Sequence, residues 1–269
     1  MSAATERAGV GTLVWAVAYK RALLLVRYPA NTLASVLGIY LFFAVIFFGG
    51  RAAVGGMGGG AGALGGTFDA LVVGWFLWTM STVAYFGLAQ GITQESQWGT
   101  LEQLYMSPYG FGAVMGARVV ALLGESLLWG GSVLVLMLVT TDRALSVDVL
   151  TVVPVVVLAL LSVVGIGFVF AGAALVYKRI ENVTQLMQFV IIGLVAAPVA
   201  DLPALRYLPL VQGSSMLQQA MGEGTRLWQF PAAEVAVLVA AGVGYCLAGY
   251  AVFRVAARRA RREGLMGQY

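Results

Sequence analysis

The sequence predicts an all-α integral membrane protein with six transmembrane helices, an N-terminal interfacial helix and short outer re-entrant helices. Apolar residues make up 60% of its 269 residues and charged residues only 10%, against about 25% in soluble domains. The apolar runs reach the length of roughly 20 residues that a helix needs to cross a bilayer. The chain has no histidine and one cysteine, Cys246, which excludes a disulfide framework, histidine metal sites and histidine-based triads.

Residues 1–29 are expected to form an amphipathic helix that lies on the membrane surface. The apolar stretch before Lys20 is too short to cross about 30 Å of hydrocarbon, and further basic residues follow. Such a helix places Trp15 and Tyr19 at headgroup level. A cleaved signal peptide is the alternative, but no small-residue cleavage site follows. Pro29 disfavours helix at the residue before it and so separates this segment from the first span.

Residues 31–257 hold six candidate spans, each able to cover the bilayer at about 1.5 Å per residue, the fifth only just. They occupy roughly residues 31–50, 69–92, 112–139, 150–177, 183–200 and 231–257. The Gly-rich connection at 49–66 is predicted to be a loop, because it cannot bury enough surface to order itself. The connection at about 200–230 holds apolar pieces too short to span, which favour re-entrant or interfacial helices.

The distribution of basic residues predicts the orientation, because cytoplasmic loops carry an excess of Lys and Arg. With both termini in the cytoplasm, twelve of the 16 basic residues lie inside, and four lie outside: Arg51, Arg143, Arg206 and Arg226. We therefore expect a multi-pass protein of the cytoplasmic (plasma) membrane, the inner membrane of a cell that has two. The basic tail 258–269 would anchor on anionic lipid, and 1–269 form one transmembrane domain.

The cytosolic connection between the second and third spans keeps two carboxylates, Glu95 and Glu102, in an otherwise apolar chain. If residues 94–107 are helical, these two lie seven apart on one face. No Lys or Arg occurs between Gly91 and Ala117, so an acidic loop stands on the positive side. A docking element for a partner is expected here. The alternative is a solvated connector with two surface glutamates.

Apolar and turn residues accompany these carboxylates. Trp98, Leu101 and Tyr105 would form a second face that can rest on the membrane surface or on a partner. Gly99 allows another backbone to approach closely, and Pro108 ends the element.

The pattern Glu-x-x-x-Gly-Thr-Leu-Glu-x-Leu-x-x-Ser-Pro at residues 95–108 closely resembles the cytosolic loop of the ABC-2 family of transporter permeases. The order of elements is similar over nearly the whole chain. The resemblance implies a cytosolic coupling helix within or beside this loop, docked on a separate ATPase subunit. The motif positions, with the tryptophan among them, are Glu95, Trp98, Gly99, Thr100, Leu101, Glu102, Ser107 and Pro108.

The same resemblance implies the permease subunit of an ATP-driven exporter. Its substrate would be hydrophobic or amphipathic, such as a drug, a lipid or a lipid-linked product. Two permeases would assemble with two ATPase subunits, so we expect a second copy of this chain or a related one. The chain has no Gly-x-x-x-x-Gly-Lys-Ser/Thr phosphate loop. It is therefore expected to be no enzyme by itself and to bind no cofactor, with ATP and Mg on the partner, and to bind no nucleic acid.

Four residues within the spans are candidates for the transport route. Glu125 is the one ionisable residue deep inside a predicted span, which makes it a functional candidate by default. Arg118 lies seven residues earlier on the same face; the alternative for Glu125 is a structural hydrogen bond to a neighbouring span. Trp75, Trp78 and Phe86 could line an apolar route, or they could simply pack.

Three other classes remain as alternatives. An ion-coupled secondary transporter should show broken helices and several midplane charges. An intramembrane enzyme would need a nucleophile and a base or a metal site, and we expect no catalytic and no metal-ligating residue. A non-transporting membrane scaffold could use the same cytosolic loop.

Overall fold

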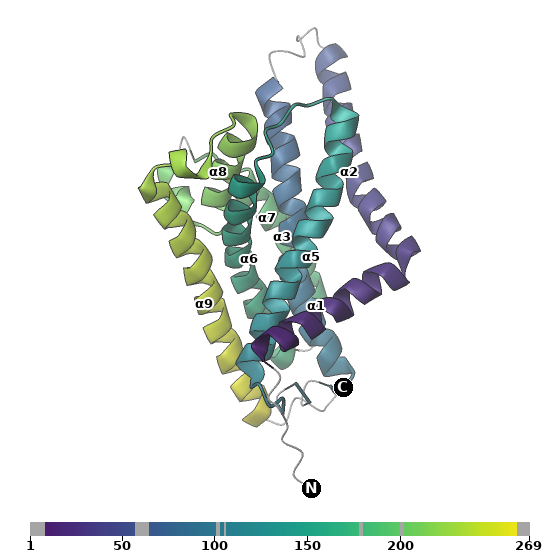
Figure 1. The fold of residues 1–269 in the computed structure, drawn as a ribbon, viewed down its shortest axis with the longest axis vertical. Coiled ribbons are helices and arrows are strands. Elements are labelled where there is room, and N and C mark those ends of the chain that lie inside the picture. The colour runs from purple at the N-terminus through teal and green to yellow at the C-terminus, as the bar shows by residue number, and fades with distance from the viewer. Residues whose placement is uncertain are drawn as a thin grey trace.

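The computed structural model describes residues 9–56, 65–100, 103–104, 106–177, 180–199 and 202–262. Helices account for 86% of them, and no strand occurs within these ranges, so the all-α prediction is confirmed. The elements (Figure 1) are α1 Val10–Arg27, α2 Pro29–Gly56, α3 Gly65–Gln97, α5 Phe111–Thr141, α6 Val149–Tyr177, α7 Glu181–Val195, η1 Pro203–Tyr207, α8 Val211–Gly222, η2 Leu227–Gln229 and α9 Ala232–Arg262.

Five of these helices, α2, α3, α5, α6 and α9, are long and apolar enough to cross a membrane. The chain is therefore a multi-pass membrane protein by length and composition. Helix α1 covers the segment expected to be a separate amphipathic helix, and it runs obliquely to the long helices (Figure 1). The C-terminal ends of α3, α6 and α9 lie at one end of the bundle, which we call the inner end. Helix α8 lies at the opposite, outer end.

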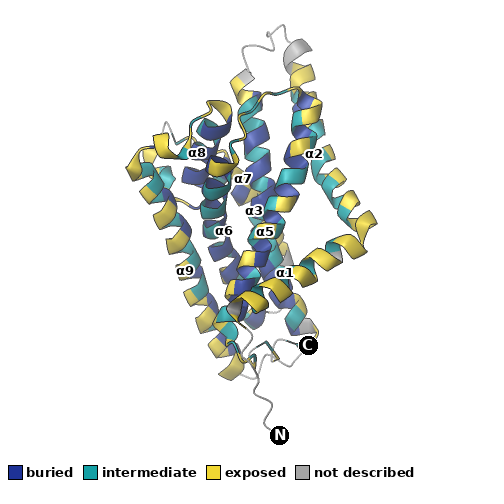
Figure 2. Cartoon of the chain, viewed as in Figure 1, coloured by how far each residue is buried: buried dark blue, intermediate teal, exposed yellow. Residues whose placement is uncertain are grey.

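The core is built around α6, which packs against α3, α8 and α9. Buried residues gather on α3, α6 and α8, whereas α1, α2 and α9 show many exposed residues (Figure 2). The most apolar stretch of α6 is 56% buried and that of α2 only 11%. Because both stretches are apolar, α2 keeps a face that lipid or another subunit must cover.

Helices α6 and α9 approach each other until their backbones touch. A Cβ at Gly165 would lie 2.1 Å from the carbonyl oxygen of Tyr245, and a Cβ at Gly249 would lie 2.0 Å from that of Gly165. Gly242 meets the Leu158 carbonyl in the same way. Small residues at such contacts are how helices associate in membranes, where burial of apolar surface from water no longer drives packing.

The fifth predicted span, 183–200, is shorter in the structure. Helix α7 has 15 residues, about 22 Å at 1.5 Å per residue, and stops at Val195. Its last carbonyl accepts a hydrogen bond from the Ser214 hydroxyl of α8 at 2.7 Å, and Pro198 follows closely. At its other end the Tyr85 hydroxyl donates to the Thr184 carbonyl at 2.9 Å, whereas Val195 lies next to Gly74 of α3. Helix α7 therefore runs antiparallel to α3.

The Gly-rich segment is more helical than predicted. Helix α2 continues to Gly56 and α3 begins at Gly65, so parts of 49–66 expected to be loop are helix. The physical reason is propagation, since each added residue gains a backbone hydrogen bond once a helix exists. Residues 57–64 lie outside the described residues. The short helices expected within 200–230 are present as η1, α8 and η2.

Candidate functional site

The Glu-x-x-x-Gly-Thr pattern ends α3 by a Schellman motif. Gly99 has a φ of 69°, and its N–H donates to the Ser96 carbonyl at 3.2 Å. The Thr100 N–H donates to the Glu95 carbonyl at 3.0 Å. These two bonds satisfy the last carbonyls of the helix. A single helix over 94–107 is therefore wrong, because the left-handed glycine turns the chain.

The side chains of the motif close this turn on itself. The Thr100 hydroxyl donates to the Glu95 carboxylate, and the Thr100 carbonyl accepts the N–H of Leu104 at 3.3 Å. Ser107 begins the next turn, where its carbonyl accepts the Gly110 N–H at 3.0 Å, with Pro108 between them. Three residues of the expected docking surface lie outside the described residues: Leu101, Glu102 and Tyr105.

Trp98 stands out at this corner because 65% of it is exposed. It occupies the last position before Gly99, so the cap that ends α3 also fixes where its side chain emerges. Met106, further along the same connection, is 75% exposed. Two large apolar side chains are thus displayed at the inner end, on a backbone held by hydrogen bonds.

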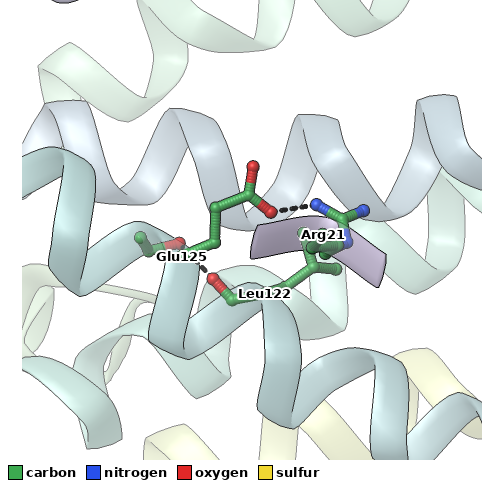
Figure 3. A network of polar contacts seen from close by, with 4 residues as sticks. Arg21, Leu122 and Glu125 are labelled. Carbon is green, nitrogen blue, oxygen red and sulfur yellow. Dashed lines mark hydrogen bonds and ion pairs between the residues drawn. The ribbon is translucent and has the colours of Figure 1, made fainter. Parts of the chain in front are cut away.

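Glu125 forms an ion pair with Arg21 of α1 (Figure 3). The two side chains are only 24% and 17% exposed, Arg21 first. The sequence pointed to Arg118 as the neighbouring cation, whereas the structure brings a residue from 104 positions away. The contact ties α1 to the middle of α5, since Glu125 is the fifteenth of that helix's 31 residues.

Arg118 lies beside this pair and packs against α3 at Gly91. A Cβ at Gly91 would lie 1.6 Å from its Nη2 and 2.6 Å from its Cζ, so the guanidinium occupies the space that Gly91 leaves open. Its charged neighbours are Arg21 and Glu95. Its Nε is buried and has no hydrogen-bond partner among the described residues.

These charges line a cavity of about 670 Å³, which we call the inner cleft. It lies between α1, α3 and α5 and reaches the motif connection at Trp98 and Leu104. Its charged lining residues are Lys20, Arg21, Glu95, Arg118 and Glu125. The predicted docking motif and the predicted intramembrane carboxylate therefore border one cavity.

A second cavity of about 630 Å³, which we call the apolar groove, lies between α2, α3, the end of α7 and α8. Trp75 and Trp78 line it, with ring centroids 4.8 Å apart. Both indole Nε1 atoms are buried without a hydrogen-bond partner within the described ranges. Phe86 is not among the lining residues and stacks edge-on against Tyr85. Two of the three predicted lining aromatics are thus brought together.

Sequence reasoning missed Arg21 and the floor of the groove. Arg21 looked like one of several surface cations of an interfacial helix, and only its unusual partner distinguishes it. Ser214, Ser215 and Gln218 supply polar groups to the groove from α8; a polar face on a short apolar helix was the available signal. No family model matches the chain, and no curated protein matches it. The functional interpretation therefore rests on residues and geometry.

Proposed function

We propose that this chain is the membrane-spanning subunit of an ATP-driven exporter of the ABC-2 type, with a separate ATPase chain docked at the inner end. The observation that carries the proposal is the motif corner. Trp98 is exposed on a turn held by the Gly99 cap and by the bond between Thr100 and Glu95. A rigid, exposed aromatic residue is the kind of anchor on which interfaces depend. Among the described residues, no further part of the chain covers this side chain.

The ion pair between Arg21 and Glu125 supports a route for mechanical coupling. A force on the motif corner acts on α3 directly, and α1 is fixed to α5 by that pair. Helix α5 in turn packs against α3. Movement of an ATPase at the inner end would therefore turn α3, α5 and α1 as a unit relative to α2, the kind of rigid-body change that opens transporters.

The apolar groove supports a hydrophobic or amphipathic substrate. Its wall is largely apolar, and its polar side chains are few: Trp75 and Trp78, whose indole N–H groups have no partner within the described residues, Thr67 of α3, and Ser214, Ser215 and Gln218 of α8. Sites with that balance bind largely apolar molecules and orient them by a few polar contacts. A drug-like molecule, a lipid or a lipid-linked product fits this chemistry, and a small ion does not.

In this proposal α7 is the fifth of six crossings, and both termini are cytosolic. Helix α6 ends at the inner end and α9 begins at the outer end, so the chain must return between them (Figure 1). Helix α7 with residues 196–199 makes that return beside α3. The exposed apolar faces of α2 and α7, which include Leu41, Val45 and Phe189, would be covered by the second permease subunit and by lipid.

An ion-coupled transporter is supported less well. Its mechanism needs a carboxylate that changes protonation or binds an ion near the midplane. Glu125 is the acidic residue in the middle of a described span, and Arg21 already neutralises it.

Purification of the tagged chain in mild detergent from its native cells tests the proposal. An ATPase with a phosphate loop should co-elute in equal amount, and vesicles holding the pair should take up substrate only with ATP. If the chain elutes without an ATPase under conditions that keep it folded, the proposal is wrong. A co-eluting ATPase that hydrolyses ATP without any transport would instead favour a scaffold.

A further inference from the structure

We propose that the inner cleft binds the phosphate of an anionic phospholipid from the cytosolic leaflet, held by Arg118 and Lys20. This site goes beyond the proposed transport function, because the lipid would be a resident ligand whether or not the chain transports anything. The charge balance of the cleft, its depth and the apolar part of its wall each point to this ligand.

The lining carries an excess of positive charge, since Lys20, Arg21 and Arg118 stand against two carboxylates, Glu95 and Glu125. Glu125 is paired with Arg21, and Glu95, a charged neighbour of Arg118, accepts the Thr100 hydroxyl. Arg118 keeps a buried Nε without a partner among the described residues. A half-buried guanidinium is costly unless an anion or several acceptors meet it. A phosphate oxygen is the matching acceptor, because guanidinium groups bind phosphate in a planar, two-pronged geometry.

The position of the cleft fits a headgroup. Lys20, Arg21 and Tyr28 come from α1 and from the residue that joins α1 to α2. This junction is where the chain turns from an oblique helix into an apolar helix able to span. Basic pockets between helices at that level bind lipid headgroups. A free anion would also meet Arg118, so depth alone does not separate lipid from inorganic phosphate.

The remaining lining separates them. Val17, Leu25 and Val114 are apolar, and Trp129 and Tyr28 are aromatic. Such a wall has nothing to offer an isolated phosphate ion, whereas it can cover the glycerol and the first methylenes of an acyl chain. Amphipathic aromatic side chains are typical of this depth. The ligand is therefore an amphiphile with a phosphate group.

Lipid binding to the purified full chain tests the site by native mass spectrometry. The probes are palmitoyl-oleoyl phosphatidylglycerol, phosphatidylcholine with the same chains, and inorganic phosphate. We expect one phosphatidylglycerol per chain to survive delipidation and to bind about tenfold more tightly than phosphatidylcholine. Arg118→Gln should abolish that preference, and Lys20→Gln, on an exposed side chain that cannot disturb folding, should weaken it severalfold.

Arg254→Gln is the matched control, since Arg254 is an exposed arginine of α9 outside the cleft. It should bind phosphatidylglycerol like the unmodified chain. Unchanged binding in both Arg118→Gln and Lys20→Gln would overturn the site, and so would an equal loss in Arg254→Gln. Displacement of phosphatidylglycerol by millimolar inorganic phosphate would overturn the lipid assignment, because a free anion would then satisfy the cleft.

Discussion

At the residue scale, the motif separates into residues that shape a turn and residues that face outward. The cap that ends α3 is formed by Glu95, Gly99 and Thr100, through two backbone hydrogen bonds and one side-chain hydrogen bond. Within the described part of the loop, Trp98 is the large aromatic residue of the motif and is exposed, together with Gly99 and Pro108. The motif predicted to be one docking surface therefore also contains the residues that fix the shape of the turn.

The ion pair between Arg21 and Glu125 should contribute to stability. Glu125→Gln keeps the shape of the side chain but leaves Arg21 beside Arg118 without its counterion, which should cost about 2 kcal/mol. A double-mutant cycle with Arg21→Gln, followed by thermal unfolding in detergent, measures the coupling. The coupling energy should exceed about 1 kcal/mol, whereas strict additivity of the two losses would mean that the pair contributes nothing.

At the scale of elements, apolar length predicted α2, α3, α5, α6 and α9, because a helix in lipid must satisfy its own backbone. The end of α7 could not be predicted in the same way. It stops where Ser214 of α8 meets its last carbonyl, and that contact exists only in the folded bundle. The partner of Glu125 could not be predicted for the same reason, since no local sequence pattern links α1 to the middle of α5.

The contact between α6 and α9 should fail when a methyl group is added at its centre. Gly165→Ala places a Cβ against the Tyr245 carbonyl, and overpacking of this kind costs about 1–3 kcal/mol. Gly244→Ala is the control on α9, because nothing lies within 4 Å of its Cβ; alanine there should be neutral or slightly stabilising. The melting temperatures of the two variants in detergent test this prediction. Equal melting temperatures would refute the close contact between α6 and α9.

At the scale of the whole molecule, the class of protein followed from composition, but the number of crossings did not. Five helices satisfy length and apolarity, and the proposed sixth crossing is the return of the chain from the end of α6 to the start of α9 by α7 and residues 196–199. Without that crossing the number would be odd and the termini would lie on opposite sides of the membrane. The count depends on how a helix about 22 Å long continues through residues 196–199.

Reporter fusions at the two ends of the chain resolve this count. Because α7 is proposed as a full crossing, a cytoplasmic reporter should be active at both the N-terminus and the C-terminus. A fusion at Ser146, in the α5–α6 connection at the outer end, should be silent and serves as the control. A C-terminal reporter that is active only on the outer side would show that α7 does not cross.

Docking at the inner end is tested most directly by the amount of ATPase that two tryptophan variants retain on purification. Trp98 and Trp228 are each 65% exposed, but Trp98 lies at the inner end. Trp228 belongs to η2, whose Leu227 N–H donates to the Thr151 hydroxyl at the start of α6, at the outer end. Trp98→Ala should lose at least about tenfold of the ATPase affinity, as expected for a central aromatic anchor. Trp228→Ala should retain all of it, at an unchanged melting temperature for both. Full retention by Trp98→Ala, or an equal loss in Trp228→Ala, would contradict docking at the motif corner.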